Sequence, residues 1–289
     1  MNIKKYFKYP FWFLRRICLS RNFIVVWGIK TDHGGRKGRN EDSLCVVKPH
    51  NEKILIAGVA DGMGGLKSRG LNGRKASKKV IENVRKIPQN MNKEPDKTSS
   101  ELLYMSIQNS QKEIVEQGKG RMGSTISIVI IDGHGKLVWQ NVGDSRIYHV
   151  SPDNIRQLTR DHSVAWRNFV ETGRLSKEEV RVLDENCQLY NYLGLPKEIQ
   201  IDNGEEQLRA GDCVVICSDG LTDVVDDSII QDFVNTFPPQ KSAKMLVKRA
   251  KELAKKEADN ISVIVLKALE LNKNIVIKHI RSKILSISE

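Results

Sequence analysis

An apolar segment that ends on a carboxylate and a run of glycines occupies residues 54–65. Residues 54–60 carry no charge and predict a buried strand of a sheet. The strand leads into Asp61, and three of the next four residues are glycines, which allow backbone or ligand to approach closely. A carboxylate in this position either caps a tight turn or holds a cation, and the segment alone does not distinguish the two.

Other acids also lie at the edges of predicted strands. With Asp61, the set comprises Glu41, Asp42, Asp144, Asp219, Asp223 and Asp259. Acids that gather without His or Cys are hard oxygen ligands, which suit Mg²⁺ or Mn²⁺ rather than Zn²⁺. Any one of them is explained as an ordinary turn residue, but several close together would repel one another unless cations lay between them.

Apolar periodicity predicts the remaining elements. Strands are expected at 23–30, 44–48, 54–60, 125–131, 136–141, 146–150, 213–217 and 261–266. Helices are expected at 71–87, 98–117, 227–236 and 241–257. A polar loop is expected at 88–95, and a polar, helix-prone surface insertion at about 157–183. Strands joined by short turns pair antiparallel, and strands that are apolar on both faces need cover on both faces. The pattern therefore predicts stacked sheets with helices outside them.

The net charge of +12 is concentrated at the two ends of the chain. Residues 1–40 contain ten Lys and Arg against one acid, residues 271–289 contain four against one, and residues 41–270 balance at 33 against 33. Residues 1–22 also contain six closely spaced aromatic side chains. We predict a basic aromatic extension at 1–22, a body at 23–270 and a basic tail at 271–289.

The cysteines and the hydropathy exclude several classes of protein. Five cysteines are scattered without the paired spacing of a zinc site, and their odd number argues against a disulfide framework. No uncharged apolar stretch reaches about 18 residues, so a membrane span is not expected. These features favour a cytoplasmic protein.

Seven short motifs, in this order, resemble those of the PP2C-type (PPM) metal-dependent protein Ser/Thr phosphatases, in particular the bacterial branch. Each motif alone is weak, and their common order over about residues 24–267 makes the resemblance specific. The motifs are 40–43 (Asn-Glu-Asp-Ser), 61–65 (Asp-Gly-Met-Gly-Gly), 123–125 (Gly-Ser-Thr), 142–146 (Val-Gly-Asp-Ser-Arg), 158–163 (Leu-Thr-Arg-Asp-His-Ser), 218–223 (Ser-Asp-Gly-Leu-Thr-Asp) and 259–260 (Asp-Asn).

The resemblance implies an α+β fold, a four-layer αββα sandwich in which two antiparallel sheets are flanked by helix pairs. It implies hydrolysis of phosphoserine and phosphothreonine in proteins by a dinuclear Mg²⁺ or Mn²⁺ centre that activates a bridging water. The residue-by-residue match makes Asp61 the bridge between the ions. Asp219 and Asp259 would hold one ion, and Glu41 with the Gly62 carbonyl the other.

Three further positions follow from the same resemblance. Asp42 would be a nearby acid that supports the metal ligands. Asp144 and Asp223 match positions that hold a third, weaker ion in some members. The insertion at about 164–186 matches a flap beside the active site that touches substrate.

The chain departs from the family pattern in three places. Lys37 stands where most members have an Arg that grips phosphate, and because Lys lacks the bidentate fork, its neighbours Arg36 and Arg39 are equally candidates. Met63 replaces a His that could protonate the leaving group in some eukaryotic members, so a water is expected to do so. Residues 191–194 (Asn-Tyr-Leu-Gly) replace a Thr-Arg-Ala-Leu-Gly segment, which leaves substrate selection open.

Three rival classes fit less well. A catalytically weak PP2C-like binding or scaffold module should lack metal acids, and all of them are present. A cysteine-dependent tyrosine phosphatase needs an Arg six residues after a Cys, and none of the five cysteines has one. A P-loop nucleotide enzyme needs Gly-Lys-Ser/Thr after a strand, and 64–66 (Gly-Gly-Leu) does not supply it.

The expected partners are phosphoproteins that a Ser/Thr kinase has modified, and the chain is expected to act as a monomer. Nucleic acid is not expected, because the body is neutral. Basic ends with aromatic or aliphatic residues are typical of interfacial anchors, so they predict docking on an anionic membrane or an acidic partner. The protein would then be peripheral at the membrane. The alternative is that both ends fold back on the sandwich with their charges solvated.

Overall fold

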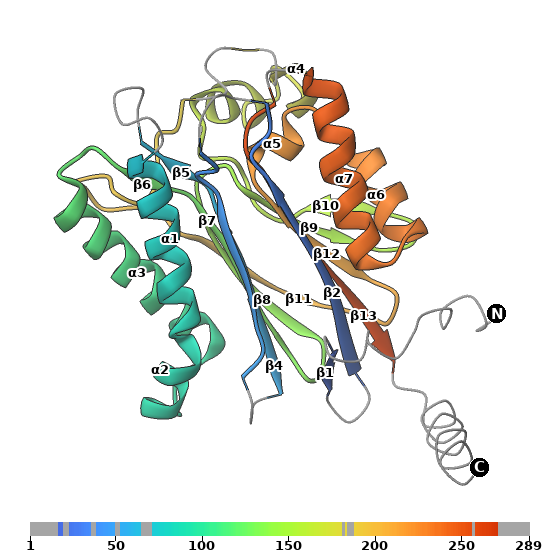
Figure 1. Ribbon diagram of the computed structural model, residues 1–289. Coiled ribbons are helices and arrows are strands. Elements are labelled where there is room, and N and C mark those ends of the chain that lie inside the picture. Colours follow the sequence, from blue (N-terminus) through green and yellow to red (C-terminus); the bar gives the residue numbers. More distant parts are fainter. Residues whose placement is uncertain are drawn as a thin grey trace, which may run out of the picture.

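Two large antiparallel sheets stack face to face, with helices on both outer faces (Figure 1). The computed structural model describes residues 17–19, 23–35, 39–49, 53–64, 71–180, 183, 188–255 and 258–270. This arrangement confirms the predicted α+β fold with its αββα layers.

The first sheet has six strands in the order β1-β2-β13-β12-β9-β10. Their bounds are β1 Ile17–Leu19, β2 Phe23–Asp32, β13 Ile261–Glu270, β12 Cys213–Cys217, β9 Arg146–Val150 and β10 Ile155–Gln157. Helix α7 (Pro239–Ala254) packs on β2 and β13, and α6 (Asp227–Thr236) packs on α7 and β10. The short helix α5 (Asp219–Thr222) follows β12 directly.

The second sheet has five strands in the order β11-β8-β7-β4-β3. Their bounds are β11 Asp202–Gln207, β8 Lys136–Val142, β7 Ile126–Asp132, β4 Ile54–Ala60 and β3 Ser43–Val47. Helices α1 (Leu71–Arg85), α2 (Ile87–Lys93) and α3 (Ser99–Gly118) form its outer layer. A two-residue pair joins β5 (Gly62–Met63) to β6 (Gly123–Ser124).

The alternation of side chains along the central strands produces three apolar cores. On β4, Ile54 and Ile56 join the core beneath α1 and α3, whereas Leu55 and Ala57 join the core between the sheets. β12 divides its side chains in the same way between the inter-sheet core and the core beneath α6 and α7. Because both faces of these strands are covered, their sequences are apolar throughout, as the sequence predicts.

Three edge strands and one helix depart from the sequence prediction. β11 reads Asp-Asn-Gly-Glu-Glu-Gln and lacks an apolar pattern; main-chain pairing with β8 holds it, together with a Lys136–Glu205 ion pair of 2.8 Å. β1 lies inside the expected extension at 1–22, and β10 begins before the expected insertion. The loop predicted at 88–95 is wrong over residues 88–93, because α2 accommodates a proline in its first turn.

A glycine sets the distance between β2 and α7. A Cβ atom on Gly28 would lie 2.2 Å from the Gln240 nitrogen, at the start of α7. We therefore expect Gly28→Ala to reduce the free energy of unfolding by about 1–3 kcal/mol, because the helix must shift away from the sheet. Urea unfolding followed by circular dichroism measures this loss.

Gly58→Ala is the matched control, since Gly58 is also a strand glycine. The nearest atom to its added Cβ would be the Ser127 carbonyl oxygen at 3.5 Å, an ordinary contact. Its stability should change by less than about 1 kcal/mol. Equal losses in both variants would contradict the close approach at Gly28.

Candidate functional site

Antiparallel pairing brings the predicted acids to one edge of the sandwich. Ser43 pairs with Ala60, so Asp42, which precedes β3, lies beside Asp61, which follows β4. Cys217 pairs with Val263 in the other sheet, which brings the start of α5 close to the residues that precede β13. Asp219 and Asp259 occupy those two places, and α5 lies at the same end of the sandwich as β5 (Figure 1).

The four acids act on one another electrostatically across the two sheets. Burial, together with the charges of Asp219 and Asp259, raises the pKa of Asp42 to about 7. Burial and the charges of Asp42, Asp219 and Asp259 raise the pKa of Asp61 well above its usual range. The structure therefore assembles these residues into one acidic site, although they come from four separate strand ends.

The donor set of this site fits a hard divalent cation. Asp42 Oδ1 and Asp219 Oδ1 are buried and accept no hydrogen bond from the part of the chain that the structure describes, whereas Ser218 Oγ donates to Asp42 Oδ2 at 2.9 Å. Buried carboxylate oxygens without donors are costly, and a cation removes that cost. Within the described residues no three acids, His or Cys converge closely enough to cage an ion. The fit therefore rests on the chemistry of the oxygens and on their electrostatic coupling.

Glu41 and Gly62 meet at a glycine that the sequence analysis did not single out. A Cβ atom on Gly73 of α1 would lie 2.0 Å from Glu41 Oε1 and 2.4 Å from the Gly62 carbonyl oxygen. Only glycine at position 73 lets both oxygens lie against the helix backbone. The sequence does contain an indication of this contact. Gly73 is the third residue of the predicted helix, and a glycine there weakens the helix unless close packing requires it.

Asn260 joins the loops that carry the acids. Its Oδ1 accepts a hydrogen bond from the Glu41 amide at 2.7 Å, and its Nδ2 donates to the His33 carbonyl at 3.0 Å. Ser77 of α1 donates through Oγ to the Glu41 carbonyl. The Glu41 backbone is thus held by the residue that precedes β13 and by helix α1. The Asp-Asn pair at 259–260 marked this position in the sequence, but its role is visible only in the structure.

Asp144 and Asp223 border the same site next to Asp219. Burial, then the charges of Asp219, Asp161 and Asp223, raises the pKa of Asp144 well above its usual range. Burial and the Asp219 charge raise the pKa of Asp223 to about 8. Both acids therefore extend the acidic site toward β9 and α5.

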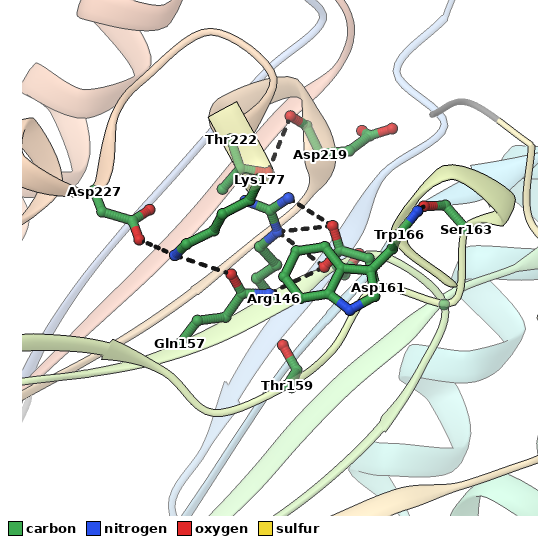
Figure 2. Close-up of polar contacts among 12 residues, drawn as sticks. Arg146, Gln157, Thr159, Asp161, Ser163, Trp166, Lys177, Asp219, Thr222 and Asp227 are labelled. Atoms are coloured by element: carbon green, nitrogen blue, oxygen red, sulfur yellow. Dashed lines mark hydrogen bonds and ion pairs between the residues drawn. The ribbon is translucent and has the colours of Figure 1, made fainter. Parts of the chain in front are cut away.

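A buried ion pair lies beside these two acids. Arg146 Nε donates to Asp161 Oδ1 at 2.9 Å, and Arg146 Nη2 donates to Asp161 Oδ2 at 2.5 Å (Figure 2). Arg146 Nη1 donates to the Tyr148 hydroxyl at 3.2 Å. Burial alone would lower the pKa of Arg146, but the Asp161 charge raises it well above its usual range. Arg146 is thus a permanent positive charge next to the acidic site.

The insertion contacts this ion pair directly through Trp166 and is linked to it through Lys177. It contains a π-helix at Trp166–Val170 and α4 at Lys177–Val180. The Trp166 ring lies 5.6 Å from the Arg146 guanidinium, and Lys177 Nζ pairs with Asp227 Oδ2. Lys177 Nζ also donates to Gln157 Oε1 at 3.5 Å, and Gln157 Nε2 donates to Asp161 Oδ1 at 3.1 Å (Figure 2). A continuous polar chain therefore links the insertion to Arg146.

His162 holds the turn that carries Asp144. Its Nδ1 accepts hydrogen bonds from the Gly143 amide at 3.1 Å and from Asn191 Nδ2 at 2.7 Å. Because Nδ1 accepts both, the ring proton resides on Nε2, which lies 3.2 Å from Asp202 Oδ2. Asn191 belongs to residues 191–194, which depart from the family pattern. This segment therefore helps to hold the turn that carries Asp144.

The three candidate phosphate ligands are only partly placed. Arg39 is exposed and lies two residues before Glu41. Arg36 and Lys37 lie outside the described residues, as do 1–16, 271–289 and, within the insertion, residues 181–182 and 184–187.

Comparisons with known proteins agree with the fold. A family model described as protein phosphatase 2C matches residues 30–262. The serine/threonine phosphatase stp of Listeria innocua is 29% identical over 247 residues, which cover 82% of this chain and 93% of that protein. The protein phosphatase PhpP of Streptococcus pneumoniae is 28% identical over 239 residues, which cover 81% of this chain and 93% of that protein.

Solved structures show the same arrangement of layers. The serine/threonine phosphatase PstP/Ppp of Mycobacterium tuberculosis matches with a TM-score of 0.72 and 26% identity, over 86% of this chain and 99% of that one. The catalytic domain of PstP in complex with two manganese ions matches with a TM-score of 0.69 and 26% identity, over the same shares.

The buried ion pair gives a prediction about stability. Asp161→Asn leaves the buried Arg146 without its counter-charge, so we expect the free energy of unfolding to fall by about 3–5 kcal/mol. Glu205→Gln is the control, because its 2.8 Å pair with Lys136 is exposed and should contribute less than about 1 kcal/mol. Urea unfolding measures both losses, and similar values for the two variants would contradict a stabilising role for the buried pair.

Proposed function

This chain belongs to the protein phosphatase 2C family and is a metal-dependent protein serine/threonine phosphatase, and we propose that the acidic edge of its sandwich carries the reaction. The observation that supports this placement is the gathering of Asp42, Asp61, Asp219 and Asp259, where burial and the neighbouring charges raise the pKa values of Asp42 and Asp61. The two manganese ions in the PstP structure indicate the kind of ion that such a site takes.

We propose that Asp61 bridges two Mg²⁺ or Mn²⁺ ions. Asp219 and Asp259 hold one ion, and Glu41 with the Gly62 carbonyl holds the other. The close packing of the Glu41 and Gly62 oxygens on Gly73 supports the second half of this assignment.

The remaining acids have supporting places in this proposal. Asp42 lies behind the ligands, where Ser218 donates to it. Asp144 and Asp223 hold a third, weaker ion, which their raised pKa values next to Asp219 support.

When bound, two such ions lower the pKa of a water between them and neutralise charge on the phosphoryl oxygens. The side chains of the protein orient the phosphate for attack. Arg36, Lys37 and Arg39 supply cations for the phosphate oxygens, and exposed Arg39 lies two residues from Glu41. Met63 carries no exchangeable proton, so a water protonates the leaving Ser or Thr alkoxide.

The substrates of the chain are phosphoproteins, and we propose that they are the targets of a Ser/Thr kinase. We further propose that the chain acts as a monomer in the cytoplasm, for which three free, buried cysteines are suitable. Nucleic acid is not a proposed partner, because the charge of residues 41–270 balances.

We also propose that the two basic ends bind an anionic membrane together. Phe23, which begins β2, pairs with Glu270, which ends β13, so the tail leaves the body beside the strand that follows the extension. Two weak electrostatic anchors at one place add their binding free energies. Among the described residues no helix is long and apolar enough to cross a bilayer.

Removal of the divalent metal should abolish hydrolysis of phosphoserine and phosphothreonine peptides. With Mn²⁺ or Mg²⁺ present, Asp61→Asn and Asp219→Asn should each retain less than about a tenth of the wild-type rate, a loss of more than about 1.4 kcal/mol of transition-state stabilisation. Phosphate release measures the rates, and calorimetry measures Mn²⁺ binding. Asp153→Asn, in an exposed turn, is the control and should behave as the wild type.

Activity that survives chelation would contradict the proposal, and so would an Asp61→Asn variant with normal Mn²⁺ binding and normal turnover. In the same assay, Ala replacement of Arg36, Lys37 or Arg39 should raise KM for at least one of the three. Unchanged kinetics in all three variants would show that this loop does not contact the phosphate.

Sedimentation with vesicles tests the membrane proposal. The full-length chain should bind vesicles that contain phosphatidylglycerol at low salt and should ignore neutral phosphatidylcholine vesicles. A chain that lacks residues 1–22 should bind more weakly. Equal binding by both chains would exclude the extension as an anchor, and no binding by the full-length chain would exclude the membrane altogether.

A further inference from the structure

Helix α7 carries a row of lysines on its outer face. Every member is exposed to solvent, and consecutive members are three or four residues apart, which places them on one side of a helix. We call this row the lysine stripe. It consists of Lys241, Lys244, Lys248 and Lys251, together with Lys255, the C-cap residue that directly follows the helix.

The inner face of α7 is buried, which fixes the side of the helix on which the stripe lies. Ala243, Leu246, Val247 and Ala250 are buried in the core between α7 and the first sheet. The helix is therefore fixed in rotation, and the stripe lies on its solvent-exposed side. It is a permanent surface feature of the fold.

The stripe is a local excess of positive charge on a neutral body. Residues 239–255 contain six Lys and Arg against Glu252, whereas residues 41–270 as a whole balance. Lysines four residues apart, such as Lys244 and Lys248, repel each other and destabilise the helix slightly. Among the described residues, no carboxylate lies within ion-pair distance of Lys241, Lys244 or Lys255. Lys248 pairs with Glu252 at 3.8 Å and Lys251 with Asp32 at 2.9 Å, so three of the five lysines have no carboxylate partner among the described residues.

The stripe leads to the acidic site. Lys251 Nζ lies 2.9 Å from Asp32 Oδ1, which also accepts a hydrogen bond from the Gly34 amide at 3.1 Å. A Cβ atom on Gly34 would lie 1.9 Å from the Asp259 carbonyl oxygen, so this loop packs directly on the backbone of Asp259. Lys255 precedes Asp259 by four residues.

The course of α7 gives the stripe a defined length. Figure 1 shows α7 running along the first sheet toward the end of the sandwich where α5 lies. Its 16 residues span about 24 Å at about 1.5 Å per residue. An extended peptide of about seven residues covers the same distance.

We propose that the lysine stripe is a docking surface for an acidic segment of the phosphoprotein substrate. A run of Asp and Glu beside the phosphorylated residue would lie along α7 while the phosphate occupies the acidic site. The chain would thus prefer phosphoserine and phosphothreonine that are flanked by acidic sequence. This inference rests on the proposed function, because it takes the acidic edge as the place of reaction.

The charge pattern favours an acidic peptide over a bilayer. A helix that binds a membrane surface inserts an apolar face among the lipids, and the apolar face of α7 is already buried in the core. Leu253 is the single large apolar side chain of α7 that is exposed, at 38%. A row of flexible ammonium groups instead matches carboxylates spaced along an extended chain.

Two phosphothreonine peptides of equal length test the proposal. One carries a seven-residue tract of Asp and Glu next to the phosphorylated core, and the other carries Asn and Gln in the same positions. For the full-length chain at low salt, we expect kcat/KM to be about tenfold higher for the acidic peptide, since several exposed ion pairs each contribute modestly. The preference should disappear near about 0.5 M salt.

Two triple variants distinguish a specific effect of the lysine stripe from an effect of the overall positive charge. Lys241→Gln/Lys244→Gln/Lys248→Gln should reduce the preference to less than about twofold, the level at which fewer than one exposed ion pair remains. The control replaces the same number of exposed lysines on the other helix layer, as Lys75→Gln/Lys78→Gln/Lys93→Gln, and should keep the preference. Hydrolysis of a small aryl phosphate, which cannot reach α7, should be the same in all three proteins.

Binding provides a readout that does not depend on catalysis. A fluorescent, unphosphorylated acidic peptide should bind the wild type and the control variant, and should bind the stripe variant several-fold more weakly by anisotropy. If aryl phosphate is not hydrolysed, the proposed function fails while anisotropy still decides the docking surface.

Three results would overturn the inference. The first is a wild type without preference for the acidic peptide. The second is an equal loss in the control variant. The third is a stripe variant that keeps its peptide preference but no longer binds phosphatidylglycerol vesicles, which would make the stripe a membrane surface instead.

Discussion

Asp42, Asp61, Asp219 and Asp259 repel one another because antiparallel pairing delivers the ends of four strands to one edge of the sandwich. A fold built from two covered sheets can tolerate this repulsion, since the apolar cores on each side of the strands hold the strand ends in place. The local cost of the acids is therefore met by packing elsewhere, and a divalent cation relieves it.

Residues around the acids reduce the cost of this repulsion, some in direct contact with the acids and others further away. Ser218 and Asn260 supply hydrogen bonds to an acid side chain or to the backbone that carries one. Gly73 removes a side chain so that two oxygens can approach. Arg146 supplies a positive charge that Asp161 keeps in place, and the insertion holds Asp161 through Gln157. One polar chain, from Lys177 through Gln157 to Asp161, thus connects the insertion to Arg146.

The sequence predicted the buried elements well and the edge elements poorly, for a physical reason. β4 and β12 are apolar on both faces, so their amino-acid composition alone predicts that they are buried. β11 is held mainly by main-chain bonds to β8, and such bonds leave no mark on side-chain identity.

The same division applies to the site. Acids at strand ends are readable from motifs, and their placement beside one another follows from strand pairing. The contacts of Gly73 with Glu41, and of His162 with Asn191 and Asp202, join residues far apart in sequence. No local pattern encodes such contacts, so only the folded chain reveals them.

The pairing of β2 with β13 sets the distance between the acids and the end of the first sheet that is opposite them. Phe23 and Glu270 form one end of this ladder, and Asp32 and Ile261 form the other, next to the acids. Ten residues at about 3.3 Å each put about 30 Å between the two ends. The point at which β2 and β13 meet the terminal parts of the chain is therefore separated from the acids by the whole length of this ladder.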